Sequence, residues 1–178
     1  SSDPDGDTLS YSWQLINPTG ASVGLGQANT ATPTFTVFSN ASGPSNTNAP
    51  GVYTLELTVD DGNGGTSTDT VDITIGNQAP TVETIPDVTA NLNPNQNFIV
   101  QPQVASFTDP ENDTTGVTYQ WVQIAGPAVT AFGGINTPNA FANVTGGVQQ
   151  NTTYVFEVTA TDTYGATATD TFSFTALV

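Results

Sequence analysis

The sequence contains no lysine, arginine, histidine or cysteine. Without cysteine, a disulfide-stapled scaffold, thiol catalysis and cysteine-type zinc sites are excluded. Without lysine, an intramolecular isopeptide crosslink to Asn or Asp is impossible. The only catalytic chemistry left is hydrolysis by paired carboxylates, which needs one carboxyl group with a raised pKa in an apolar pocket. The carboxyl groups of this chain fall mostly in glycine-rich loops, so we expect no enzyme.

The charge of the chain has a single sign. Its 178 residues include 16 acidic and no basic side chains, which gives a formal net charge of -16. Such a field repels nucleic acid and anionic membranes and attracts cations. No apolar run is long enough to span a membrane, and no signal-peptide pattern is present. We therefore expect neither a nucleic-acid partner nor membrane insertion of this segment.

The chain contains an internal repeat. The segment DPDGDTLSYSW (3–13) recurs as DPENDTTGVTYQW (109–121), and the segment that begins at Tyr53 recurs without a gap from Tyr154. This repetition predicts two domains, residues 1–78 and 79–178. In the second copy, about 30 residues precede the acidic segment. The first copy has no counterpart of these residues. The first domain is therefore expected to lack its opening strands.

Apolar and polar residues alternate with a period of two through most of the chain. Tyr11, Trp13 and Leu15 alternate with polar residues, as do the residues that follow Tyr53 and Tyr154. This period is typical of half-buried strands, and no segment shows a helical period. Two glycine-containing loops, 61–65 and 163–165, are predicted to close hairpins. The sequence thus predicts an all-β chain of two tandem immunoglobulin-like β-sandwich domains.

The large aromatic side chains are expected mostly in the cores. Trp13 and Trp121 fit the tryptophan on the third strand of an immunoglobulin-type sandwich, and Tyr53 and Tyr154 fit the tyrosine at the start of its sixth. The remaining assignments follow the alternation: Phe35 and Phe141 are predicted in the core, Tyr164 is predicted exposed in a hairpin loop, and Asp69 and Asp170 are predicted on a solvated strand face.

Three motifs carry a family resemblance. They are SDPDGDTLSYSW (2–13), GPAVT (126–130) and DTVDITI (69–75). With them the chain resembles the PKD-like or cadherin-like repeats of bacterial and archaeal surface and secreted proteins. The resemblance covers both copies nearly end to end and implies the sandwich fold. It leaves the function open, since these modules serve as spacers, adhesin stalks, filament subunits and appendages of secreted hydrolases.

Acidic residues gather in the loops that this topology places at one end of each domain. The candidate metal ligands are Asp3, Asp5, Asp7, Asp60 and Asp61 in the first copy, and Asp109, Glu111, Asp113 and Asp162 in the second. No Lys or Arg can relieve their repulsion, whereas Ca²⁺ with its oxygen ligands can. The alternative is that these are polar turns, in which Asp side chains accept nearby amide N–H groups. A calcium ion at the second domain's acidic end is expected to stiffen the joint between the domains.

The function predicted from these features is structural. We expect a calcium-stiffened segment of an extracellular or cell-surface adhesin stalk or filament. Its partners are expected to be neighbouring repeats and other copies of the chain, joined by strand donation if the first domain is completed from outside. The alternative is a carbohydrate-binding accessory module of a secreted hydrolase, which predicts an exposed patch of two or three aromatic side chains.

Overall fold

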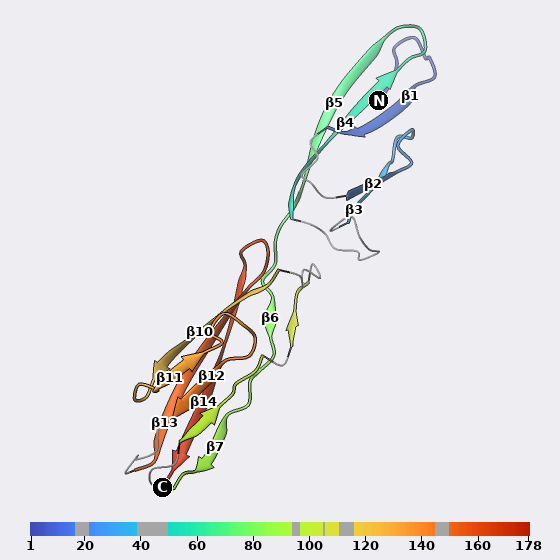
Figure 1. Cartoon of the computed structure of the whole chain (residues 1–178). Helices are drawn as coiled ribbons and strands as arrows, with labels where there is room; N and C mark the ends of the chain where they lie inside the picture. Colours follow the sequence, from blue (N-terminus) through green and yellow to red (C-terminus); the bar gives the residue numbers. More distant parts are fainter. Residues whose placement is uncertain (17–21, 39–49, 94–96, 105, 111–115, 145–149) are drawn as a thin grey trace. The chain divides into compact units, whose positions relative to one another are not determined.

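A computed structural model describes residues 1–16, 22–38, 50–93, 97–104, 106–110, 116–144 and 150–178. The described residues form strands, turns and bends without a helix, so the predicted all-β class is confirmed (Figure 1). No described segment forms a helix with the length and apolar character needed to cross a membrane. The chain divides into two compact units, Ser1–Asn77 (unit 1) and Gln78–Val178 (unit 2).

Unit 1 consists of two small sheets. Its strands are β1 (Ser10–Leu15), β2 (Ser22–Gly26), β3 (Thr34–Phe38), β4 (Gly51–Asp60) and β5 (Thr66–Ile75). One sheet has the order β1-β4-β5, and β2 and β3 pair separately. The rings of Phe35 on β3 and Tyr53 on β4 meet edge to face at 5.5 Å. This contact joins the two sheets through a small core that also includes Val37.

The predicted 61–65 hairpin loop connects β4 and β5, and Asp60 and Thr66 are the last pair before it. Every second residue of β4 faces the core, as the alternation predicted: Tyr53 is fully buried and Leu55 is 3% exposed. The opposite face of the sheet is polar, where Gln14 of β1 donates to the Glu56 carboxylate at 2.6 Å.

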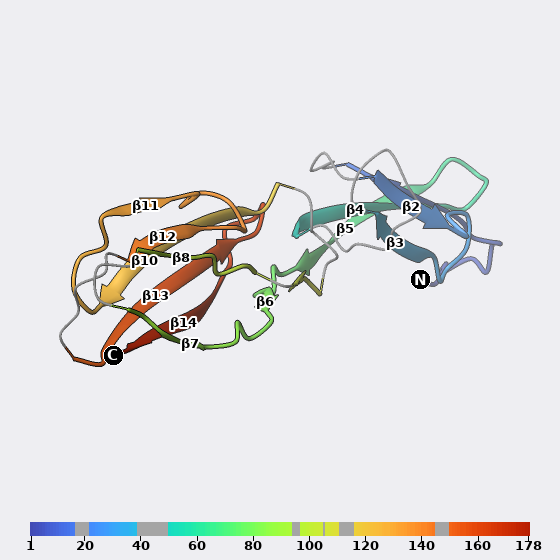
Figure 2. The same cartoon turned by 60° about the horizontal axis from the view of Figure 1, so that its bottom comes forward.

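Unit 2 is a fuller sandwich. Its strands are β6 (Thr81–Val82), β7 (Val88–Asn91), β8 (Phe98–Val100), β9 (Phe107–Thr108), β10 (Thr118–Ala125), β11 (Ala131–Gly133), β12 (Phe141–Val144), β13 (Thr152–Thr161) and β14 (Thr167–Leu177). One sheet has the order β10-β13-β14-β7 and a second the order β11-β12-β8, which Figure 2 shows as two layers. A short pair of β6 and β9 completes the unit.

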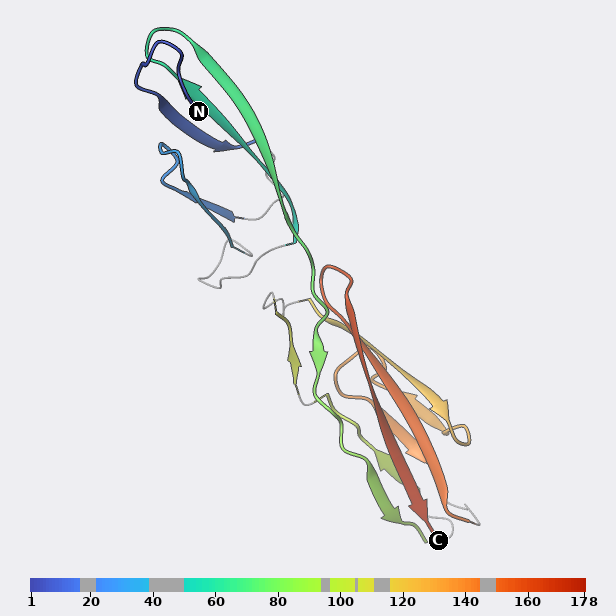
Figure 3. The same ribbon diagram turned by 180° about the vertical axis from the view of Figure 1, so that it is seen from behind.

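The two layers of unit 2 are joined by stacked aromatic rings. Phe98 of β8 lies 5.2 Å from Phe174 of β14, and Phe132 of β11 lies 5.2 Å from Phe156 of β13. Trp121 is 1% exposed at the centre of this core. β7 runs parallel to β14 along its outer edge, as Figure 3 shows from behind.

One core prediction is wrong. Phe141 on β12 is 42% exposed and is not part of the core of unit 2. It pairs across the strands with Gly133, and its ring lies over the space that a Cβ at Gly133 would occupy. The ring therefore covers the backbone of a neighbouring strand on the outer face, where an aromatic side chain compensates for a glycine with nothing to pack.

Candidate functional site: the acidic loop end of each unit

The first acidic loop of unit 1 is a polar turn. The Asp3 carboxylate accepts the backbone N–H groups of Asp5 at 2.8 Å and Asp7 at 3.1 Å. Gly6 supplies the left-handed backbone of this turn, with a φ of 83°. An Asp at the start of such a turn satisfies main-chain donors that no strand can reach.

The second acidic loop of unit 1 is built in the same way. One Asp61 carboxylate oxygen accepts N–H groups from Asn63 at 2.7 Å and Gly65 at 2.9 Å, and Asp60 accepts one from Gly62 at 2.6 Å. The two N–H groups on Asp61 stabilise its charged form, so the pKa of this carboxyl group lies below its ordinary value of 3.8.

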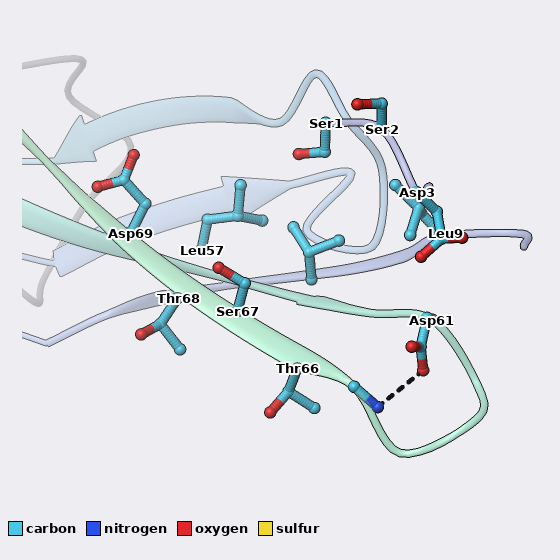
Figure 4. A pocket seen from close by; sticks show the side chains of 12 residues that line it. Ser1, Ser2, Asp3, Leu9, Leu57, Asp61, Thr66, Ser67, Thr68 and Asp69 are labelled. Carbon is cyan, nitrogen blue, oxygen red and sulfur yellow. Dashed lines mark hydrogen bonds between the residues drawn. The ribbon is translucent and has the colours of Figure 1, made fainter. Parts of the chain in front are cut away.

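The two loops meet at one end of unit 1, as the topology predicted. The Asn63 side-chain amide donates to the Asp7 carboxylate at 2.8 Å, which ties the hairpin loop to the first loop. Asp3 and Asp61 line the same pocket of about 460 Å³, shown in Figure 4. The structure therefore brings Asp3, Asp7 and Asp61 to one end of the sandwich.

The equivalent end of unit 2 is partly described. Asp162 is 5% exposed, and one of its carboxylate oxygens accepts N–H groups from Tyr164 at 2.8 Å and Ala166 at 2.9 Å. Asp109 is half-buried. The neighbouring loops approach each other, because a Cβ at Gly116 would lie 2.8 Å from the side chain of Thr163. The last two predicted ligands, Glu111 and Asp113, lie outside the described residues.

These loops fit the polar-turn interpretation more closely than a built calcium site. Within the described residues, no three carboxylates come close enough together to share an ion. Asp3, Asp60, Asp61 and Asp162 each hold main-chain N–H groups of their own loops. Carboxylate oxygens are the ligands that Ca²⁺ prefers, but it takes six to eight oxygens, more than this arrangement gathers. Calcium binding stays a prediction.

Sequence reasoning missed two carboxylates of unit 2 that hold strands together. Asp170 on β14 accepts the backbone N–H of Ile85 at 2.6 Å, and Asp87 accepts the backbone N–H of Ser173 at 2.8 Å. The bonds from Ser173 lower the pKa of Asp87. The prediction of a merely solvated Asp170 is wrong, and a signal existed, since Asp170 alternates in phase with the buried Phe172 and Phe174.

Two described carboxyl groups have pKa values shifted in the direction opposite to the one that acid catalysis needs. Acid catalysis by a carboxyl group needs a raised pKa. The two carboxyl groups with shifted pKa values, Asp61 and Asp87, are both shifted downward by hydrogen bonds to their charged forms. The pKa values of Tyr119 and Tyr154 are raised because burial disfavours their ionised form.

Residues 1–75 and 86–175 both match the model of the family described as K319L-like, PKD domain. The chain belongs to this family. The match confirms the predicted resemblance to PKD-like repeats, and with the all-β fold it supports two tandem immunoglobulin-like domains. PKD domains are generally non-catalytic and typically extracellular. A comparison with curated protein sequences finds no match.

Several solved structures resemble the PKD chain weakly. A nucleoside hydrolase-related hypothetical protein from Saccharophagus degradans is 13% identical over 57% of this chain, with a TM-score of 0.43. The endo-fucoidan hydrolase MfFcnA4 of glycoside hydrolase family 107 is 15% identical over 97%, with a TM-score of 0.37. Drosophila N-cadherin EC1-4 is 14% identical over 97%, with a TM-score of 0.39. The chain spans 26%, 24% and 42% of these structures, respectively.

Proposed function

We propose that this chain is a non-enzymatic structural segment of an extracellular surface protein, either an adhesin stalk or a filament subunit. The observation that carries the proposal is the match of both repeats to one PKD family, over residues 1–75 and 86–175. Tandem copies of a small sandwich suit a spacer, because each copy adds length while keeping its own core. The uniformly negative charge suits a surface that stays soluble and apart from its neighbours.

Single-molecule stretching of the full chain tests this role. Two separate unfolding events are expected, and each should lengthen the chain by about 3.5 Å per residue of the unit that unfolds. Because each unit has its own core, the two events should be independent of each other. A single event at very low force would contradict a load-bearing segment, and so would turnover of a polysaccharide by the purified chain.

The carbohydrate-binding alternative rests on two exposed aromatic side chains. Tyr164 is 48% exposed in the hairpin loop of unit 2, and Phe141 is 42% exposed on β12. Aromatic rings on a protein surface can stack on sugars, but the Phe141 ring already covers the backbone of Gly133. Co-sedimentation with insoluble polysaccharides decides the matter: retention that is lost in Tyr164→Ala and unchanged in Tyr11→Ala would favour this alternative.

Calcium stiffening is the finer part of the structural proposal. It is supported by the meeting of two acidic loops in unit 1 and by the absence of any lysine or arginine to neutralise them. Thermal unfolding with about 1 mM calcium, followed by EGTA, provides the test. A rise of several degrees is expected that EGTA reverses and that Asp3→Asn/Asp7→Asn/Asp61→Asn removes. An equal response to magnesium and calcium, or none, would leave these loops as ordinary turns.

A further inference from the structure

One asparagine of this chain is followed by a glycine. It is Asn63 in the loop between β4 and β5, and no other asparagine in the sequence precedes a glycine. Asparagine is a thermolabile residue, because the backbone nitrogen of the next residue can attack its side-chain amide carbon. A side chain on that next residue hinders the attack, so glycine is the successor that favours it most. Asn63 and Gly64 are both exposed, and water therefore reaches the pair.

The backbone of the loop requires this glycine. Gly64 has a φ of 101°, a value that residues with a side chain rarely adopt. Apart from its two chain neighbours, no described atom lies within 4 Å of the position that a Cβ at Gly64 would take. The turn therefore fixes a glycine after Asn63, and no packed group of the described chain shields it.

The corresponding turn of unit 2 has the same backbone and a different side chain. Asp61 and Asp162 each accept the N–H groups of the residues two and four positions later. Gly165 has a φ of 93°, close to that of Gly64. The residue before Gly165 is Tyr164, whose ring offers no amide carbon to attack. The reactive pair is therefore particular to unit 1.

The Asn63 side chain also connects the two acidic loops. Its amide nitrogen donates to the Asp7 carboxylate at 2.8 Å, which we call the inter-loop hydrogen bond. Asp7 is exposed as well, so this bond lies on the surface. A single surface hydrogen bond contributes little net stability and opens readily. The bond therefore slows the attack on the Asn63 side chain without preventing it.

We propose that Asn63 is a site of spontaneous deamidation, which replaces the inter-loop hydrogen bond by a repulsion between carboxylates. The Gly64 nitrogen forms a bond to Cγ of Asn63, and the side-chain nitrogen leaves as ammonia with the proton of the Gly64 N–H. Water then opens the resulting succinimide ring at either carbonyl group and gives aspartate or isoaspartate. The reaction consumes one water molecule and releases one ammonia molecule, and it needs no oxidant and no enzyme.

The product has the opposite hydrogen-bonding character. An amide nitrogen that donated to Asp7 gives way to an ionised carboxylate, which only accepts. Two like charges at this distance repel each other, and the sequence contains no lysine or arginine that could neutralise either. Deamidation therefore separates the first acidic loop from the hairpin loop. The inference does not depend on the structural role proposed above, because it rests on the chemistry of these loops alone.

The test ages the full 178-residue chain at neutral pH and physiological temperature. A glutamate-specific protease then releases residues 57–83, which contain both Asn63 and Asn77. Mass spectrometry should show Asn63 converting to aspartate and isoaspartate at least about tenfold faster than Asn77, which precedes a glutamine. Asn63→Gln should abolish the conversion at this position. Asp7→Ala, which removes the acceptor of the inter-loop hydrogen bond, should accelerate it.

Thermal unfolding of unit 1, followed by the NMR signals of β4 and β5, measures the consequence. At low salt, Asn63→Asp should unfold at a lower temperature than Asn63→Ala, because both lose the inter-loop hydrogen bond and only Asn63→Asp adds a repelling charge. High salt should bring the two variants together by screening that charge.

Four results would overturn the inference. They are conversion of Asn63 no faster than that of Asn77, an aspartate product without isoaspartate, an unchanged rate in Asp7→Ala, and equal stability of Asn63→Asp and Asn63→Ala at low salt.

Discussion

The two units share a hairpin but differ in what covers it. β4–β5 and β13–β14 have the same number of pairs in the same register, yet Phe172 is 2% exposed and its counterpart Val71 is 44% exposed. The strand pairing is set by the hairpin itself, and the burial is set by the segment of residues 81–91 that lies beside β14. A repeated sequence therefore fixes a repeated backbone without fixing an equally closed core.

The tryptophans show the same division between local and distant causes. The Trp13 indole N–H donates to the Thr30 carbonyl at 3.1 Å, and the Trp121 indole N–H donates to the Thr137 carbonyl at 3.0 Å. The loop that each ring contacts is thus repeated faithfully. Trp121 is nevertheless 1% exposed, and Trp13 is only partly buried. Hydrogen bonding follows the local sequence, whereas burial depends on the rest of the sandwich.

The largest expected effect is a difference in lost stability between equivalent positions of the two hairpins. Phe172→Ala should destabilise unit 2 by about 3–5 kcal/mol, because it leaves a cavity in a closed core. Val71→Ala should destabilise unit 1 by less than about 1 kcal/mol, because its side chain is already in contact with water. Urea unfolding followed by hydrogen exchange in each unit measures both values.

A further substitution separates the effect of burial from the difference in size between Phe172 and Val71. The control is Val158→Ala, the same substitution at a fully buried position of unit 2, with an expected cost of about 2 kcal/mol. A cost equal to that of Val71→Ala would mean that both hairpins are covered to the same extent.

The hairpin loops differ in the same direction. Asp162→Ala should destabilise unit 2 by about 1–3 kcal/mol. The substitution removes a nearly buried carboxylate, and the N–H groups of Tyr164 and Ala166 then lack their acceptor. Asp61→Ala should cost less, because water reaches the N–H groups of its loop. Urea denaturation monitored by the fluorescence of Trp121 and Trp13 measures the two costs, and Asp162→Asn, which keeps an acceptor oxygen, should recover part of the loss. Equal costs would contradict the difference in burial.

A smaller effect tests the carboxylate that holds the covering segment. Asp170→Asn should weaken a charge-assisted bond to the Ile85 N–H and destabilise unit 2 by about 1 kcal/mol. Asp69→Asn at the equivalent position should cost less, because the Asp69 carboxylate accepts the exposed N–H of its own neighbour Thr70 at 2.9 Å. Chemical denaturation of both variants provides the measurement. A loss in Asp69→Asn as large as that in Asp170→Asn would contradict this difference between the two carboxylates.

The smallest effect is a dependence on pH. The pKa of Asp87 is lowered in the folded state from its ordinary value of 3.8, so its stabilising contribution is complete above that value and is lost as the pH falls through the folded pKa. Below about pH 4, the protection of the β7 amides relative to their intrinsic exchange rates should fall. Solvent screening keeps the effect small. Asp87→Asn should remove this part of the pH dependence. An equal loss of protection in that variant would mean that another titratable group causes the pH dependence.

The sequence predicted most of the fold because the relevant signals are local. Alternation located both hairpins, and the Asp61 loop forms between the strands where it was expected. The meeting of the acidic loops in unit 1 also followed from topology. The exposure of Phe141 did not follow, because alternation does not say which face of a short strand meets the core. Alternation with the buried Phe172 and Phe174 indicates that Asp170 faces inward, but no local pattern reveals its partner Ile85, which is 85 residues away in the sequence.

The exchange rates of two backbone amides in the full chain test the central claim most directly. Ser173 N–H is bonded to Asp87 on the covered edge of β14, and Asp72 N–H occupies the same register on the open edge of β5. NMR-detected hydrogen exchange should show Asp72 exchanging at least about tenfold faster than Ser173. Equal protection of the two amides would contradict the account, because it would mean that the edges of β5 and β14 are covered to the same extent.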